Sequence, residues 1–273
     1  MQAKQQNLRT DSLIYNQAGK FTEAFRNIDL RDTVENMIIR GEHLFYDEPN
    51  NRFQVTEDVL YIMTGDKDSL FLHADTLVSS REETTKSRRI KAFRQVQFFR
   101  ADIQGRCDSL DYLVIDSLIQ LFKEPVIWAD NNQLTADTLG IYLKEKGIDH
   151  LDLKSKGFMV TREDSTLYNQ IKGKMIRGFF KDDKLDRIVV TGNGESLFYP
   201  KDGEQIIGQN KAVSSSIRIA FAEKRIDKIA FLTDPDSKLT PIKDLGIKDM
   251  YLEGFLWLED KRPITREDIR VWK

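Results

Sequence analysis

The sequence predicts an all-β protein assembled from repeated, antiparallel, hairpin-sized units, and two observations support this fold class. Apolar residues recur with a period of two far more often than with the 3.6-residue period of a helix, in runs separated by turns rich in Gly, Asn, Asp and Lys. Short motifs also recur along the chain, as stacked structural repeats require. Little helix is therefore expected.

The clearest predicted strand covers Arg52–Met63. Phe53 and Val55 share one parity in this run while polar residues occupy the other, which is typical of a strand with one buried face. Leu60 and Ile62 break the alternation near its end. Similar but noisier runs predict further strands over 37–46, 118–128, 167–179, 187–191, 217–221 and 226–232.

Turn signals separate these runs. Clusters of Pro, Gly, Asn and Asp predict connections at 48–51, 130–132, 181–184 and 201–203. Gly192-Asn193-Gly194 also predicts a tight connection, because it lacks the following helix of a phosphate-binding loop. Near the end of the sequence, Thr265 and Asp268 predict a weak capping box for one short helix.

Internal repetition is the second signal. The motif Ala-Phe-Arg occurs at 24–26 and 92–94, and Ala-Asp-Thr-Leu occurs at 74–77 and 136–139. Asp-Ser-Leu begins at Asp11, Asp68, Asp108 and Asp116. Because a hairpin-sized unit cannot bury its apolar face alone, such copies are expected to stack and share one continuous core.

The repeats predict one continuous β-structure over residues 1–233, and two segments depart from their pattern. Residues 79–91 are dense in charge and predict a solvated loop rather than a basic patch for a partner. Residues 234–273 contain three prolines, which interrupt strand pairing, but they keep several aromatic and aliphatic residues. This C-terminal segment is expected to dock against another surface.

Composition and charge exclude several classes of function. The 42 Lys and Arg against 44 Asp and Glu give a net charge of −2, which provides no strong attraction to nucleic acid. No apolar run approaches the roughly 18 residues of a membrane-spanning helix. The single Cys107 excludes an internal disulfide, and His43, His73 and His150 lack the close spacing of zinc ligands. We predict no metal, no cofactor and no nucleic-acid partner.

Catalytic residues are not predicted either. Cys107 lies in a strand-like segment, where a lone cysteine is usually a small buried apolar residue. Asp75, Asp108, Asp116 and Asp137 are the acids to consider for paired-carboxylate chemistry. They recur at equivalent places in the repeats, beside Ser or Thr, which favours a structural role at turns and strand ends. The sequence therefore predicts a protein that is not an enzyme.

The repeated units resemble those of the OstA-like lipopolysaccharide-transport proteins. Residues 41–47 (GEHLFYD), followed by 53–59 (FQVTEDV), match that family's recurring pattern of a small residue, Leu, Tyr-Asp, a turn and an alternating apolar run containing Thr. Weaker copies of the pattern lie at 105–112, 136–142 and 189–199. The resemblance runs from about Leu13 to about Leu232, and its specificity comes from the repetition.

This resemblance implies a periplasmic β-jellyroll, a twisted and slightly open tube whose apolar lumen holds the acyl chains of lipid A. It implies lipopolysaccharide as the ligand, and further copies or other jellyroll proteins of the transport bridge as partners joined by edge-strand pairing. Such a carrier needs no catalytic group, because shielding each CH₂ of a lipid tail from water is worth about 0.8 kcal/mol. Residues 1–6 show no apolar export signal, so the periplasmic location is implied by the resemblance alone.

Strand parity predicts which side chains line the lumen and bind lipid. They are Leu44, Tyr46, Phe53, Val55, Val59, Tyr61, Leu110, Tyr112, Val126, Trp128, Leu139 and Ile171. A register error of one residue moves every side chain of a strand to the other face. Two other functions stay open: a structural β-solenoid with a filled core, and a carbohydrate-active enzyme, which needs two carboxylates about 5–10 Å apart.

Overall fold

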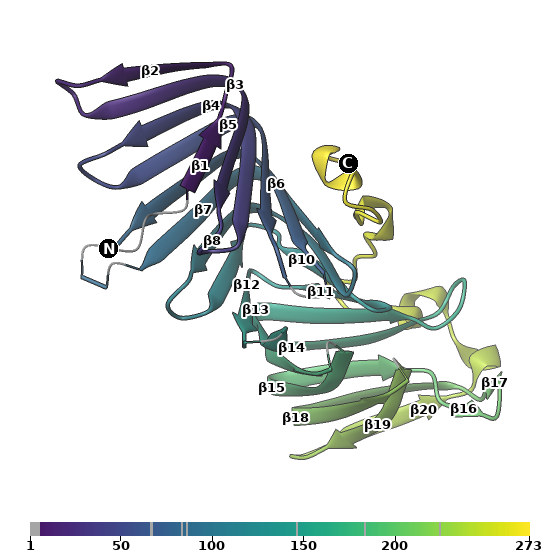
Figure 1. Cartoon of the computed structure of the whole chain (residues 1–273). Coiled ribbons are helices and arrows are strands. Elements are labelled where there is room, and N and C mark those ends of the chain that lie inside the picture. The colour runs from purple at the N-terminus through teal and green to yellow at the C-terminus, as the bar shows by residue number, and fades with distance from the viewer. Residues whose placement is uncertain are drawn as a thin grey trace. The chain divides into compact units, whose positions relative to one another are not determined.

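The computed structural model describes residues 6–65, 68–82, 84–85, 87–145, 147–182, 184–223 and 225–273. Their regular structure is almost entirely antiparallel strand, with four short 3₁₀ helices, and the all-β jellyroll prediction is confirmed (Figure 1). No helix within these ranges is long and apolar enough to cross a membrane.

The chain divides into two compact units. Unit 1 comprises Met1–Lys123 with Lys261–Lys273, and unit 2 comprises Glu124–Asp260. The boundary between the units falls inside the repeats, and the residues of the C-terminal segment are divided between the two units.

Each unit consists of consecutive strands in chain order. Unit 1 contains β1 (Gln6–Arg9), β2 (Ser12–Asn16), β3 (Phe21–Asp32), β4 (Met37–Asp47), β5 (Arg52–Met63), β6 (Leu70–Arg81), β7 (Arg88–Arg100), β8 (Ile103–Leu113), β9 (Leu118–Phe122) and η4 (Asp268–Arg270). Unit 2 contains β10 (Val126–Ala129), β11 (Asn132–Thr135), β12 (Thr138–Leu143), β13 (Ile148–Arg162), β14 (Tyr168–Lys181), β15 (Lys184–Phe198), β16 (Lys201–Asp202), β17 (Gln205–Ile206), β18 (Gln209–Ala222), β19 (Arg225–Phe231), β20 (Asp236–Thr240), η1 (Ile242–Asp244) and η2 (Ile247–Met250). The helix η3 (Glu259–Lys261) spans the boundary in the chain.

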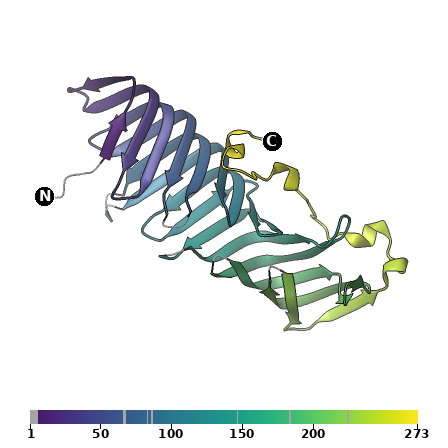
Figure 2. The same ribbon diagram turned by 45° about the vertical axis from the view of Figure 1, so that its right-hand side comes forward.

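Neighbouring strands pair in sequence order within each unit. In unit 1, β3 to β8 each pair with the next strand, and β1 and β2 pair with opposite halves of β3. In unit 2, β13, β14, β15 and β18 form the long strands, and β19 and β20 pair with opposite halves of β18. Figure 2 shows these long arrows lying beside one another.

Bulges with left-handed backbone bend the long strands. Pairs of residues with positive φ interrupt five of them: Arg26–Asn27, Glu57–Asp58, Arg94–Gln95, Ser155–Lys156 and Gly192–Asn193. The antiparallel register shifts at each of these pairs, as expected when extra residues enter one strand of a ladder. We call these pairs corners, and the strand halves on either side of them arms.

One long strand of each unit shows where the two arms lie. In unit 1 the first arm includes residues 21–25 of β3 and the second arm includes residues 28–32. In unit 2 the first arm includes residues 148–154 of β13 and the second arm residues 157–162. Because a bulge bends its strand, each unit folds its ladder into two sheets that share the same strands.

The recurring aspartates mark the strands next to corners. Asp75 pairs with Arg94 at 3.2 Å, Asp108 with Lys123 at 3.0 Å, and Asp137 with Lys156 at 3.3 Å. Each cation is itself a residue with positive φ. These pairs are exposed and are worth less than about 1 kcal/mol each, so they help to place the corner rather than hold the fold together.

Three local predictions differ from the structure or extend beyond it. Residues 79–81 and 88–91 are strand rather than loop, because the side chain of Arg88 points inward and is buried; the loop is confined to 82–87, of which 83 and 86 lie outside the described residues. Gly192-Asn193 is a corner within β15 rather than a connection between strands. The predicted turn at 181–184 includes residue 183, which also lies outside the described ranges.

The predicted capping box forms in part. The Asp268 carboxylate accepts hydrogen bonds from the backbone N–H groups of Ile264 (2.9 Å) and Thr265 (2.8 Å). The helix that follows is the single 3₁₀ turn η4, which buries Ile269. A single short turn of this kind suits a segment that follows a surface rather than one that folds independently.

Candidate functional site

The inner face of the first arm of unit 1 is a continuous apolar row. Cross-strand pairing aligns one small or aliphatic residue from each of seven strands, and all seven are buried. The row is Ala24, Leu44, Val55, Leu77, Ala92, Leu110 and Leu121. Directly paired residues lie on the same face of a sheet, so these side chains form one apolar strip across the unit.

A second strip lines the inner face of the other arm. Cross-strand pairing aligns Leu30, Ile39, Tyr61, Leu72, Phe98 and Gly105. Gly41 lies next to a corner, where the two strips come together. A Cβ at that position would lie 2.5 Å from a methyl group of Val55 on the first strip. The arms therefore converge at the corners with no room for a side chain.

Unit 2 repeats this arrangement. Its first-arm row is Leu139, Leu153, Ile176, Val190, Ile217 and Phe231, and its second-arm row is Leu134, Met159, Ile171, Ser196 and Ala212. A Cβ on Gly157 would meet Ile176 at 3.0 Å, and one on Gly173 would meet Val190 at 2.3 Å. The inner side of these corners is closed in the same way as in unit 1.

The inner rows of unit 2 lead to an apolar cleft at its last strands. The cleft has a volume of about 350 Å³ and is lined by Phe198, Pro200, Ile207, Asn210, Ile226, Asp227, Ile229, Phe231 and Leu239. It lies where β19 and β20 pair with β18 on opposite arms, and Phe231 belongs to the first-arm row. Its size is within the range of small-molecule sites.

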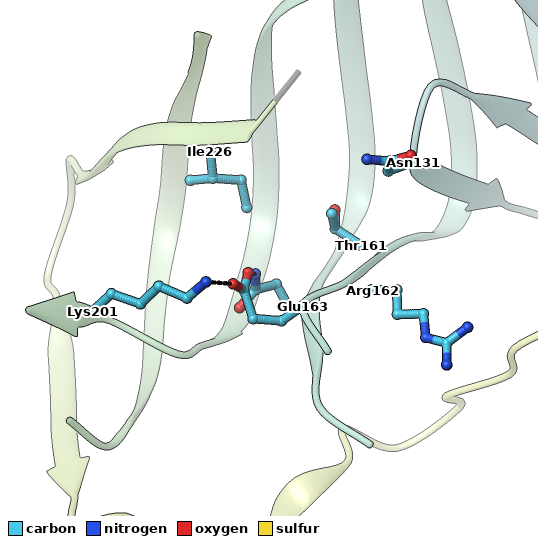
Figure 3. A pocket seen from close by; sticks show the side chains of 7 residues that line it. Asn131, Thr161, Arg162, Glu163, Lys201 and Ile226 are labelled. Carbon is cyan, nitrogen blue, oxygen red and sulfur yellow. Dashed lines mark hydrogen bonds and ion pairs between the residues drawn. The ribbon is translucent and has the colours of Figure 1, made fainter. Parts of the chain in front are cut away.

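A second cleft has a polar lining. It measures about 210 Å³ and is shown in Figure 3, where Lys201 and Glu163 form an ion pair and Ile226 faces them from β19. The amide of Asn169 also donates to Glu163 at 2.8 Å. Ile226 lines both clefts, so the apolar cleft has a charged neighbour. This combination suits a ligand with an apolar body and a polar end.

Ten of the twelve predicted lining residues lie on these inner faces. Leu44, Val55, Leu110, Tyr61, Leu139 and Ile171 belong to the rows already described. Val59 is fully buried beside the corner of β5. Tyr46, Phe53 and Tyr112 belong to a further first-arm row with Ser79, Ile90 and Ile119, in which Tyr46 and Tyr112 are half-buried. A lipid-binding role for these residues stays a prediction.

The other two predicted lining residues, Val126 and Trp128, do not lie on the inner face. In β10, Ile127 pairs with Leu134 of the inner row, so Val126 and Trp128 point to the opposite, outer face. All four residues of β10 are buried, so alternation gives no sign of which face is inner. The outer face is also covered here, because Gln133, the partner of Trp128, hydrogen-bonds to the C-terminal segment.

Sequence reasoning missed a buried ion cluster at the arm tips of unit 1. Arg88, on the first arm, reaches Asp32 (3.4 Å) and Glu35 beyond the end of the second arm. It also donates to the hydroxyl of Ser79 at 3.0 Å. Burial raises the pKa of Asp32, but hydrogen bonds from Gln6 and two backbone N–H groups and the charge of Arg88 lower it overall. We call Arg88, Asp32 and Glu35 the clasp, since they join the two arms.

Other ionisable groups inside unit 1 are held neutral. Burial, followed by the neighbouring Tyr112, raises the pKa of Tyr61 far above its usual range. Burial likewise raises the pKa of the Cys107 thiol, so this cysteine is not a reactive thiolate. Among the described residues, no group of three or more His, Cys, Asp or Glu is placed to hold a metal ion.

The environment of His73 makes the free energy of unfolding depend on pH. The Nδ1 of His73 lies 2.9 Å from the Val59 carbonyl. Burial lowers the pKa of His73, opposed by Asp58, the Val59 carbonyl and Asp75 and aided by Arg270. The unfolded chain therefore binds a proton that the folded chain excludes. We expect the free energy of unfolding to fall as the pH drops below about 6.5. In urea titrations at pH 7.5 and 5.5, His73→Gln should reduce this loss.

Comparisons with known proteins find similarity among solved structures. No protein-family model matches the sequence, and no curated protein matches it. Among solved structures, the chain is similar to LptH, the LptA-homologous periplasmic component of the lipopolysaccharide transport device from Pseudomonas aeruginosa. The two share 12% sequence identity with a TM-score of 0.40, over 52% of this chain and 100% of that chain.

Proposed function

We propose that this protein is a non-enzymatic carrier that holds acyl chains of lipopolysaccharide on the apolar inner faces of its jellyroll, in the periplasm. The observation behind the proposal is that apolar rows cross every long strand and, in unit 2, reach an apolar cleft of about 350 Å³. The resemblance of the repeated units to OstA-like transport proteins supports the same function.

The chemistry of the cleft favours a lipid over a sugar substrate. Aliphatic and aromatic side chains dominate its lining, and burying an acyl chain there gains about 0.8 kcal/mol for each CH₂ removed from water. The charged pair Lys201–Glu163 lines the neighbouring cleft, where the polar end of a lipid would remain hydrated. Three of the recurrent aspartates, Asp75, Asp108 and Asp137, are by contrast paired with cations whose backbone has positive φ.

Site-specific photo-crosslinking tests this function. A benzophenone amino acid is placed at Phe231, which lines the cleft, or at the adjacent Leu232, which is 49% exposed and outside the lining. Both full-length variants are irradiated with lipopolysaccharide and the adducts are identified by mass spectrometry. We expect an adduct at Phe231 and none at Leu232. Equal labelling, or no adduct at Phe231 in a folded protein, would contradict the carrier and favour a filled scaffold.

The same proposal includes partners joined through the edges of the sheets. Both β19 and β20 pair with β18 on one side, and β2 pairs with β3 on one side, among the pairings described. Leu13, Ile14 and Tyr15 on β2 are more than half exposed. An edge strand of this kind can pair with a further strand from another copy or another jellyroll protein.

A further inference from the structure

The outer face of unit 2 carries two buried glutamines that bind main chain. Gln133 and Gln170 are 1% and 0% exposed, and both pair with Val160, so they lie in one cross-strand row. Neither side chain serves the inner face. Each of them instead contacts residues 250–258 of the C-terminal segment, which we call the strap.

Both glutamines use the same pair of hydrogen bonds. Gln170 donates from Nε2 to the Met250 carbonyl (2.8 Å) and accepts at Oε1 from the Leu252 N–H (2.8 Å). Gln133 donates to the Leu256 carbonyl (2.8 Å) and accepts from the Leu258 N–H (2.7 Å). Each amide therefore binds a carbonyl and the N–H two residues later, as the backbone of a neighbouring strand does.

Apolar contacts supply the specificity that main-chain bonds lack. Leu252 is 3% exposed and packs with four buried outer-face residues: Phe158, Val160, Leu197 and Tyr199. Tyr168 contacts the rings of Phe255 and Trp257, with centroids 5.3 Å and 5.2 Å apart. The strap thus presents anchors in the order Leu, Phe and Trp to a sheet face that needs a cover.

A glycine turn links the two recognised pieces of the strap. The N–H of Phe255 donates to the Leu252 carbonyl at 3.1 Å, and Gly254 has φ +90°. That φ value strongly favours glycine. The pattern that fits this face is therefore Leu-x-Gly-aromatic-x-aromatic, flanked by extended main chain.

The strap leaves one polar group of this face unused. Trp128 pairs with Gln133 in the same outer row and is fully buried. Its indole N–H has no hydrogen-bond partner among the residues that the structure describes. A buried donor without an acceptor costs free energy, so the strap is an incomplete ligand for the face it covers.

We propose that the outer face of unit 2 is a peptide-binding site that the strap occupies in cis, and that a partner segment with the pattern Leu-x-Gly-aromatic-x-aromatic displaces it. No β-ladder pairs the strap with the sheet in the described residues, so its side-chain contacts and two glutamines alone hold it there. Exchange leaves the strand pairing of unit 2 intact. The proposal is independent of lipid binding, since it concerns the opposite face of the sheet.

The test uses full-length protein and a fluorescein-labelled peptide of residues 247–260. Leu252→Asp in the protein loosens the tethered strap, which otherwise competes at an effective concentration of about millimolar. We expect this variant to bind the peptide about tenfold or more tighter than the wild type in fluorescence anisotropy. A peptide carrying Gly254→Val should bind about tenfold more weakly than the unmodified peptide.

Glutamine variants identify the site. In the Leu252→Asp background, Gln133→Met with Gln170→Met should weaken peptide binding about tenfold or more. Gln97→Met is the matched control, because Gln97 binds the carbonyls of Ile269 and Val271 in unit 1 and should leave binding unchanged. Circular dichroism verifies that each variant is folded.

Two results would overturn the proposal. One is a folded Leu252→Asp protein that binds the peptide no better than the wild type does. The other is wild-type protein that forms dimers by exchanging straps, detected by light scattering and by crosslinks between straps and faces of different copies, because the occupant is then a second copy. Neither result depends on the lipid adduct at Phe231, so the two proposals fail separately.

Discussion

Replacing Arg88 with methionine is expected to reduce the free energy of unfolding of unit 1 by about 3–5 kcal/mol. The guanidinium is buried, joins Asp32 and Glu35 across the two arms, and lies 5.8 Å from the ring centre of Phe53. Without it, a carboxylate that is 4% exposed keeps its charge and loses its cation. Hydrogen exchange of the β3 and β7 amides measures this loss within unit 1.

Two comparison variants show whether the cost comes from the buried charge. Arg94→Ala removes the exposed corner pair with Asp75, whose side chains are 71% and 47% exposed, and should cost less than about 1 kcal/mol. Adding Asp32→Asn to Arg88→Met should recover part of the loss, because the unpaired charge is gone. An Arg88→Met protein as stable as the Arg94→Ala protein would show that the clasp does not hold the arms.

The clasp also explains why the predicted loop over residues 79–91 was too long. Residues 79–91 resemble a solvated loop because charge is normally exposed, but Arg88 is satisfied by carboxylates 56 and 53 positions earlier in the chain. The neighbouring sequence does not distinguish an arginine that pairs with two distant acids in the folded protein from one that is exposed to water. The strands on both sides of this turn, β6 and β7, were not among the strands that alternation predicted.

Alternation predicted the inner faces wherever the outer face is exposed. Phe53 and Val55 satisfy this condition on the first arm of β5. Leu60 and Ile62 break the alternation on the second arm because Ile269 covers their outer face, about two hundred residues later in the chain. Val126 and Trp128 were assigned to the wrong face for a similar reason. Coverage by a distant segment is a tertiary property that one strand's sequence does not encode.

The repeats predicted the architecture better than any single motif did. Ala-Asp-Thr-Leu recurs because its Asp pairs with the cation at an adjacent corner, in Asp75–Arg94 and again in Asp137–Lys156. The corner residues themselves resemble turn signals, which is why Gly192-Asn193 was interpreted as a connection. A left-handed pair inside a strand and one between strands need the same residue types.

Gly173→Ala is expected to destabilise unit 2 by about 1–3 kcal/mol, because a new Cβ would overpack the inner side of a corner. That Cβ would lie 2.3 Å from Cγ1 of Val190, which is fully buried on the neighbouring strand. Val190→Ala alone leaves a cavity, yet combined with Gly173→Ala it relieves the clash. The double-variant cycle should therefore show a favourable coupling of about 1 kcal/mol or more.

Gly178→Ala provides the matched control for this prediction. Its Cβ would approach Cδ1 of Leu185 at 3.1 Å, and a terminal methyl can move aside, so a smaller loss is expected in the same strand. Urea denaturation and hydrogen exchange of β14 and β15 measure both variants. Equal losses at the two glycines, or additive effects of Gly173→Ala and Val190→Ala, would mean that the corners are loose enough to accept a side chain. The inner space between the arms would then be wider than this packing implies, and acyl chains would meet less of the apolar rows that the proposed carrier relies on.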